Sequence, residues 1–391
     1  MNGPVRIGVV GAGNMGCGHI EYLLARAVKG GVLAAICVNA PGRLAAARTR
    51  FGDGPQYFAD TDTMLNSGTV DGVIIATPHY DHPPIAIAAF KHGVHVLSEK
   101  PAGVYTRQVR EMNQAAAESG LVFGIMFQLR TIAAHQKMRE LVQSGELGPI
   151  QRVEYVVTDW LRTQVYYDNG GWRGTWAGEG GGVLMNQCPH NLDLLQWICG
   201  MPQRILAFCR FGQYHKIETE DDVTALLEWS NGATGVFVTT TGEAPGVSRM
   251  EVIGDRGRLL MENGAITFFR TRLSVEDQVR TSPLSFPRTE WWKCDIPTGA
   301  DGDGHRAVTR DWVNAILHGK PMLARGEEGI HGVTLANAML MSTWTREWID
   351  LPLDEEVYYR LLQERVAKST WKTTAIDAPV ADLTGSYAGS R

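Results

Sequence analysis

The strongest constraint on the fold lies at the start of the chain, where a short apolar run meets a glycine-rich turn. Residues 5–10 read VRIGVV, Gly11-Ala12-Gly13-Asn14-Met15-Gly16 follows at once, and residues 19–28 carry apolar side chains at helical spacing. In such a strand–turn–helix unit Gly11 permits the tight turn, Gly13 lets the backbone approach a pyrophosphate and Gly16 lets helix and strand pack closely. The helix N-terminus offers N–H groups to phosphates. The sequence therefore predicts a dinucleotide-binding domain.

The same alternation continues to about residue 128. We predict strands over residues 32–38, 71–76, 95–98 and 122–126, and helices over residues 43–51, 83–92 and 106–119. Repeated strand–helix units favour a parallel Rossmann sheet, whose ligands bind beyond the carboxyl ends of the strands. The predicted cofactor-binding residues are Gly11, Gly13, Asn14, Met15, Gly16, Asn39, Arg43, Thr77, Pro78, His79, His82, Glu99, Lys100 and Gln128.

The end of the second predicted strand bears on the choice of cofactor. An acid there normally bonds the ribose 2′-hydroxyl and repels a 2′-phosphate, but Val38 and Asn39 stand at this place. Asn39 can still bond the hydroxyl, and Arg43 can reach a 2′-phosphate. We expect NAD and keep NADP as the alternative.

A different pattern follows residue 150, with longer alternating stretches over residues 151–158, 224–229, 233–239, 250–253 and 258–261. The hairpin dipeptide Asn231-Gly232 joins two of them. We predict an α/β Rossmann domain (residues 1–128), an α+β domain with a large, mostly antiparallel open sheet (129–355) and a C-terminal extension (356–391). Helices are expected over residues 131–144, 190–199, 328–348 and 355–368. The small polar residues 373–391 fit either a disordered end or a strap on a neighbouring subunit.

Composition excludes several classes of protein. A net charge of −5 argues against a nucleic-acid partner, and no apolar run approaches the roughly 18 residues that span a bilayer. The first ten residues lack a secretory signal, and the 6 cysteines have no zinc spacing, so we expect reduced thiols in a cytoplasmic protein. His79, His82, His92 and His95 lack the pattern of a metal site, and no metal is expected.

Four segments together resemble the Gfo/Idh/MocA family of oxidoreductases: GAGNMG at 11–16, ATPHYDH at 76–82, SEKPAG at 98–103 and GEGGGVLMNQCPHNLDLLQW at 178–197. They keep the family order, and the resemblance runs from residue 5 to about 355. It implies a Rossmann domain followed by an open sheet that covers the nicotinamide and drives homo-oligomerisation. It also implies that His82 lies against the nicotinamide ribose.

By the same resemblance, Lys100 and His190 flank the reacting carbon and pass its proton while the cofactor takes the hydride. Oxidation of an alcohol needs a base within hydrogen-bond reach of the hydroxyl. The family's usual aspartate is Asn186 here, and an amide can position a hydroxyl but cannot act as a base. An Asn186–His190 pair should hold an imidazolium less well, so Lys100, Tyr166 or Tyr167 is an alternative base.

The loop at residues 159–182 is predicted to contact substrate, because it combines 7 glycines with three tryptophans, two tyrosines and two arginines. Aromatic faces stack on sugar rings and arginines bind hydroxyls or anions. The predicted substrate-binding residues are Arg130, Arg162, Trp172, Arg173, Asn186 and His190, with Trp291, Trp292 and His305 as additions.

We therefore expect NAD(P)-dependent hydride transfer at a ring carbon, C3, of a sugar, polyol or glycoside. The first alternative is a redox-assisted glycosidase, in which a retained NAD oxidises C3, a base removes the C2 proton, the aglycone leaves, water adds and the hydride returns. Its substrate would be an anionic glycoside. The second alternative is a non-catalytic sensor that keeps the dinucleotide.

Overall fold

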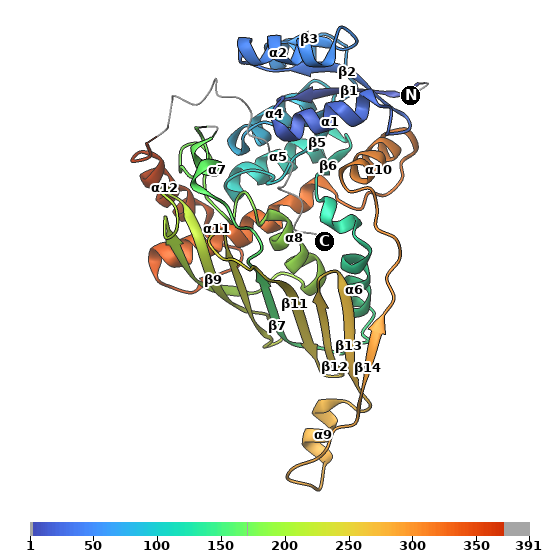
Figure 1. Cartoon of the computed structure of the whole chain (residues 1–391), viewed down its shortest axis with the longest axis vertical. Helices are drawn as coiled ribbons and strands as arrows, with labels where there is room; N and C mark the ends of the chain where they lie inside the picture. The colour runs from blue at the N-terminus through green and yellow to red at the C-terminus, as the bar shows by residue number, and fades with distance from the viewer. Residues whose placement is uncertain (1–2, 170, 371–391) are drawn as a thin grey trace.

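The computed structural model describes residues 3–169 and 171–370 and contains two domains, each built around its own sheet (Figure 1). The first domain lies at the top of Figure 1 and the larger sheet below it. Within the described ranges no helix is long and apolar enough to cross a membrane.

The first domain is the predicted Rossmann fold. Its strands run parallel in the order β3-β2-β1-β4-β5-β6, so the order reverses between β1 and β4 and opens a crevice at the carboxyl ends of these two strands. Short β3 and α3 lie in a stretch where the sequence predicted no element. The strands are β1 (Val5–Val10), β2 (Gly31–Cys37), β3 (Gln56–Phe58), β4 (Gly72–Ile75), β5 (His95–Ser98) and β6 (Phe123–Ile125), and the helices are α1 (Asn14–Leu24), α2 (Pro41–Phe51), α3 (Thr61–Asn66), 3-10 helix η1 (His79–Asp81), α4 (His82–Lys91) and α5 (Thr106–Ser119).

Helix α10 (His305–His318) packs on the first domain, although residues 129–355 were expected to form the second. Its Trp312 is fully buried against the sheet. A Cβ on Gly72 would lie 2.6 Å from the Trp312 ring, and one on Gly124 would lie 3.3 Å from it. The glycines thus leave a groove that the tryptophan fills, a contact between distant segments that local sequence patterns do not reveal.

The second domain holds the predicted open sheet. Its described strands follow the order β14-β13-β12-β11-β7-β10-β9-β8-β15, and they pair antiparallel except for β7 with β10. The strands are β7 (Ile150–Val157), β8 (Arg204–Phe211), β9 (Glu220–Glu228), β10 (Thr234–Thr240), β11 (Ser248–Gly254), β12 (Gly257–Glu262), β13 (Ala265–Thr271), β14 (Trp291–Ile296) and β15 (Ile349–Asp350).

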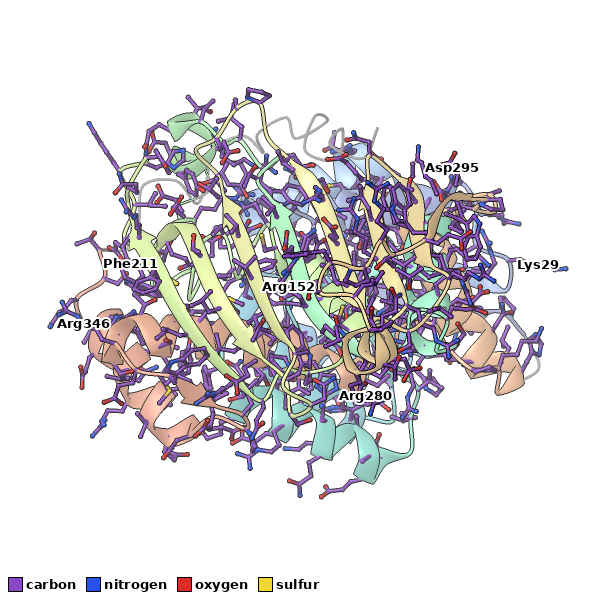
Figure 2. All side chains as sticks on the ribbon, turned by 90° about the horizontal axis from the view of Figure 1, so that it is seen from below. Lys29, Arg152, Phe211, Arg280, Asp295 and Arg346 are labelled. Carbon is purple, nitrogen blue, oxygen red and sulfur yellow. The ribbon has the colours of Figure 1, made fainter. Side chains whose placement is uncertain are left out.

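Helices cover the face of this sheet that looks toward the first domain. Leu195 of one helix, Leu335 of another and Phe237 of the sheet belong to the same buried core. Figure 2 looks onto the opposite face, where the strands lie nearest the viewer and Arg152 stands near the middle. The helical segments of this part are η2 (Gln128–Thr131), α6 (Ala133–Gln143), α7 (Gln164–Asp168), α8 (Pro189–Cys199), α9 (Val275–Thr281), η3 (Gly326–Glu328), α11 (Gly329–Thr345) and α12 (Glu355–Val366).

Two expectations about the last hundred or so residues change in the structure. Helix α12 is part of the second domain rather than an extension, because Tyr358 and Leu362 are buried in its core and Tyr358 stacks on Trp344. Trp291 and Trp292 lie on edge strand β14, 56% and 47% exposed, rather than in a pocket loop. Residues 373–391 lie outside the described residues.

Candidate functional site

A cavity of about 820 Å³ opens at the crevice between β1 and β4 and continues under the loop at residues 160–187 of the second domain. This volume is in the usual range for cofactor and substrate pockets. Of the fourteen predicted cofactor-binding residues, all but Gly16 and Gln128 line it. The lining set from the second domain is Trp160, Arg162, Tyr166, Asn169, Trp172, Arg173, Asn186, Gln187 and His190.

The glycine turn has the shape of a phosphate cradle. Gly11 has a φ of +92°, and a Cβ there would lie 2.6 Å from the carbonyl oxygen of Ala76. Gly13 differs, since a Cβ at this position would meet no atom of the described chain within 4 Å and would project into open space at the cavity. Gly13 also caps α1 without a side chain of its own, so the turn fits a pyrophosphate held by backbone N–H groups. A Cβ on Gly16 would collide with the oxygen of Gly11, which explains the close packing of helix and strand.

The adenosine end of the cavity follows β2. Asn39 and Arg43 line it together with Thr61, and residues 37–43 contain no acid. Arg50 also reaches the lining, but Glu21 pairs with it at 2.5 Å.

Glu99 and Lys100 stand at the end of β5 with different partners. Burial alone would raise the pKa of Glu99, but the hydrogen bond and charge of His19, 2.7 Å away, outweigh it and lower the pKa to about 2. The Lys100 Nζ donates to the backbone oxygen of Asn186 at 2.8 Å. Burial lowers the pKa of Lys100, while Glu99 and Glu179 act against this shift. Lys100 is thus placed to lose a proton more readily than a surface lysine.

His190 is buried at the start of α8, and its partner is Gln128 rather than Asn186. The Gln128 Nε2 lies 3.0 Å from the His190 Nε2, which therefore accepts, and the His190 Nδ1 has no hydrogen-bond partner among the described residues. Burial first, and then the charge of Lys100, hold the pKa of His190 well below its usual value, so the ring is neutral. The Asn186 side chain bonds Glu179, so the expected Asn186–His190 pair is not formed.

Two guanidinium groups flank Tyr166 at the open side of the cavity. Arg173 lies 4.6 Å and Arg162 5.3 Å from the centre of its ring, and the Tyr166 hydroxyl accepts a hydrogen bond from Gln187 at 3.1 Å. Trp172 stands edge-on to His79 at 5.2 Å. The loop thus provides the cationic and aromatic surface that its composition predicted.

His79 and His82 join the loops around the cavity. The His79 Nδ1 donates to the Glu179 backbone oxygen across the domain boundary at 3.2 Å. Both ring nitrogens of His82 lie 2.8 Å from carbonyl oxygens, those of Thr77 and Pro101. The two histidines therefore fix the walls of the cavity.

Three predicted site residues lie elsewhere. Arg130, in η2, is fully buried in a bidentate pair with Asp193 and also contacts Glu328. Its charge is therefore neutralised inside the protein, and the substrate-binding prediction is corrected. The Tyr167 hydroxyl bonds Thr241 in the core, and burial raises its pKa far above the usual value, which removes Tyr167 as a base. His305 packs 5.8 Å from His19, behind the cavity wall.

Glu179 was missed, although it stands in the quoted segment GEGGG. It is 1% exposed, directly behind Asn186, and burial raises its pKa to about 7. A single acid among glycines, at the start of the segment that resembles the family signature, was the available signal. Gln187, which holds Tyr166, was missed as well.

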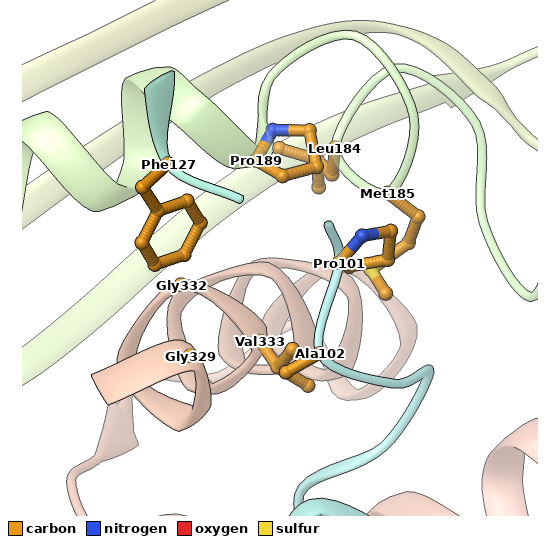
Figure 3. Close-up of a pocket in the computed structure, with 9 residues that line it drawn as sticks. All are labelled: Pro101, Ala102, Phe127, Leu184, Met185, Pro189, Gly329, Gly332 and Val333. Carbon is orange, nitrogen blue, oxygen red and sulfur yellow. The ribbon is translucent and has the colours of Figure 1, made fainter. Parts of the chain in front are cut away.

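A second, very small cavity of about 10 Å³ lies at the seam between the domains (Figure 3). Pro101, Ala102, Phe127, Leu184 and Val333 are among the residues that line it. It has room for about one water and an apolar lining, so it is a packing defect rather than a binding site.

A parallel sheet of this order, a glycine cradle at its switch point and a lysine with a lowered pKa in the same cavity define a dinucleotide-dependent oxidoreductase. Comparison with known proteins agrees: residues 5–127 match the model of the oxidoreductase family with an NAD-binding Rossmann fold, and residues 135–260 match the GFO/IDH/MocA C-terminal domain. The chain belongs to the Gfo/Idh/MocA family.

Individual relatives span nearly the whole chain. The 1,5-anhydro-D-fructose reductase of Ensifer adhaerens is 30% identical over 326 residues, covering 81% of this chain and 90% of that protein. The D-glucoside 3-dehydrogenase of Escherichia coli is 29% identical over 371 residues, covering 89% and 98%. The WlbA dehydrogenase of Bordetella pertussis, solved in complex with NADH and UDP-GlcNAcA, has a TM-score of 0.74 at 29% identity and covers 90% of this chain and 100% of its own.

Proposed function

We propose that this oxidoreductase removes hydride from the C3 carbon of a sugar, polyol or glycoside, with Lys100 and His190 on either side of the reacting carbon. The observation that carries the proposal is the place of Lys100: it lines the cavity together with Asn186 and His190, its ammonium bonds the Asn186 carbonyl, and burial lowers its pKa. The names of two relatives, an anhydrofructose reductase and a glucoside 3-dehydrogenase, support this substrate class and this carbon.

Residues Gly11–Met15 would hold the pyrophosphate of NAD, and Asn39 and His82 would lie near its ribose groups. The bound cofactor would supply the hydride acceptor. The chain's own residues handle the proton. Lys100 in its neutral form accepts the hydroxyl proton, and the resulting ammonium keeps its bond to the Asn186 carbonyl. Neutral His190 offers a nitrogen without a partner among the described residues, which can bond the same or a neighbouring hydroxyl.

The proposed substrate is anionic. Arg162 and Arg173 line the cavity, and their Nη1 atoms donate to backbone carbonyls of their own loop. The Nε atom of each is buried without a hydrogen-bond partner in the described chain. Two neighbouring guanidiniums whose donors are not used up fit a carboxylate or sulfonate. Replacing each arginine by glutamine should raise KM for such a substrate about tenfold or more while neutral sugars change little, and equal binding of the anion by both variants and the unchanged protein would end this part of the proposal.

A redox-assisted glycosidase is the second candidate, because Tyr166 remains available to it. Its hydroxyl lies in the cavity, held by Gln187, where it could remove the proton from the carbon next to an oxidised C3. Tyr167, the other tyrosine of the pair, no longer qualifies.

One experiment separates the candidates. The purified protein is denatured and the released NAD(H) and NADP(H) are assayed, and glycoside turnover is then followed without added cofactor. NADH formed in step with sugar oxidation, by protein that arrives without cofactor, supports the dehydrogenase. Stoichiometric bound NAD with aglycone release and no net NADH supports the glycosidase. Bound dinucleotide without turnover of any tested sugar supports the non-catalytic sensor.

We further propose that the chain is a homo-oligomer joined through the outer face of its second sheet, the face seen in Figure 2. Phe208 and Leu226 stand on neighbouring strands and are 62% and 44% exposed. Light scattering should give a mass of two or more chains for the unchanged protein and a lower mass for F208E/L226E. A monomer in both cases would contradict the proposal.

A further inference from the structure

The carboxyl group of Glu179 lies immediately behind the amide that lines the cavity. Its Oε1 accepts a hydrogen bond from the Asn186 Nδ2, and its Oε2 accepts one from the Gly174 N–H at 2.6 Å. Asn186 lines the cavity, while Glu179 is 1% exposed and lies beneath this lining. Glu179 therefore reaches the cavity through Asn186.

The loop that carries Glu179 is closely packed around its glycines, and this packing fixes the contact between Glu179 and Asn186. A Cβ on Gly178 would lie 2.5 Å from the Trp172 oxygen, and one on Gly180 would lie 2.1 Å from Val104, so side chains are excluded at both neighbours of Glu179. Glu220 accepts from the Gly182 and Leu184 N–H groups and anchors the next turn. Burying a carboxyl group costs stability, and this loop is built to hold one.

The surroundings of Glu179 bring its protonated and ionised forms close to equal population at neutral pH. Burial raises its pKa to about 7, against the hydrogen bonds of Asn186 and Gly174 and the positive charges of Arg173 and Lys100. The other titratable groups that face it are Glu220, Tyr167 and His79. A small change of local charge, such as a proton arriving on Lys100, therefore favours the ionised carboxylate.

We propose that Glu179 is a positioning residue for the oxidation, and that through Asn186 it supplies the carboxylate that position 186 itself lacks. The inference rests on the proposed role of Lys100. An ionised carboxylate only accepts hydrogen bonds, so it holds the Asn186 Nδ2 toward itself and turns the Oδ1 away from it, where this oxygen can accept a bond from a substrate hydroxyl. When Lys100 takes the hydroxyl proton, the nearby negative charge stabilises the new ammonium.

An exchange of the two side chains tests the idea. E179Q should lower kcat about 10- to 100-fold and displace the acid limb of the pH profile of kcat/KM. N186D alone places two carboxyl groups in contact, which then share a proton, so its acid limb should move to higher pH. E179Q/N186D restores one carboxylate and one amide, and its kcat should return to within about fivefold of the unchanged enzyme. An unchanged kcat and pH profile in E179Q, or a double variant no faster than the slower single one, overturns the proposal.

A control and a readout that does not depend on turnover separate this inference from the proposed function. E218Q alters another carboxylate that binds the same loop, at the Trp176 N–H, and should leave the pH profile unchanged. Infrared titration of the protein without cofactor should show a carboxylic acid band that ionises near pH 7 and is absent from E179Q. If this band is missing, Glu179 does not have the assigned role, whether or not sugars are oxidised. If it is present but no sugar is oxidised, the proposed function fails instead.

Discussion

The G13A substitution should separate cofactor binding from folding. Gly13 has extended backbone angles (φ −78°, ψ −167°) that alanine adopts without strain, and its Cβ would meet no described atom within 4 Å. Alanine is a poorer helix cap than glycine by roughly 1 kcal/mol, but it narrows the unfolded ensemble by about 0.4–1 kcal/mol. These effects nearly cancel, so the free energy of unfolding should change by less than about 1 kcal/mol.

The same methyl group has a large effect on the cofactor. It projects into the cavity where the pyrophosphate is expected to meet the backbone N–H groups of α1. Displacing the phosphates should lose about one charge-assisted hydrogen bond, worth about 1.5–3 kcal/mol. This corresponds to a rise of roughly 10- to 150-fold in the Kd for NADH.

NADH fluorescence titration and thermal unfolding measure the two quantities. G11A is the matched control, because a φ of +92° and a Cβ 2.6 Å from the Ala76 oxygen make alanine costly to the fold. G11A should lower Tm clearly, and G13A should not. The reasoning is refuted if G13A binds NADH as tightly as the unchanged protein, or if its Tm falls as far as that of G11A.

Three further predictions concern specificity and stability. N39D places an acid at the end of β2 and should shift the NAD/NADP preference toward NAD by about tenfold, measured as the ratio of kcat/KM values; an unchanged ratio would place the 2′-position elsewhere. R130M leaves Asp193 buried without its partner and should cost about 3–5 kcal/mol in urea unfolding, whereas a stable variant with a raised substrate KM would return Arg130 to the binding site. Burial lowers the pKa of His305 to about 4, so the unfolded chain binds more protons below pH 6.5 and stability should fall as pH drops from 6.5 to 4. The slope of Tm against pH in this window should be shallower for H305N, and an equal slope in both proteins would rule out His305 as a source.

The first domain could be predicted because its information is local. Each strand from β1 to β6 except β3 is a short apolar run next to a helical pattern. The glycine turn after β1 predicts that the first crevice binds a dinucleotide. Strands β7 and β9 to β12 of the second sheet were recognisable from their alternating side chains and from Asn231-Gly232, whereas β8, β13, β14 and β15 were not predicted. Strand β3 and helix α3 were not predicted, because at three and six residues they are too short to show a clear periodicity.

Parts of the site could not be predicted, because they depend on contacts between distant residues. Arg130 follows the end of a strand, where a binding role was expected, but it forms a buried ion pair with Asp193, 63 positions later. Nothing in the pattern YY distinguishes Tyr166, which faces the cavity, from Tyr167, which faces the core. Glu179 meets Asn186 only because the glycine loop folds back on itself. The roles assigned to Lys100 and His190 stay predictions.

The packing of α10 on the first sheet has a consequence for how the protein is made. Trp312 fills the groove at Gly72 and Gly124, yet it leaves the ribosome roughly 190 residues after β6, some 10–40 s later at about 5–20 residues/s. During this time the nascent Rossmann sheet carries an open apolar groove, and every strand of the second sheet except β15 is synthesised before the groove is filled. Truncated chains that end before residue 305 should therefore depend on chaperones, and the first domain becomes complete only when most of the second has emerged.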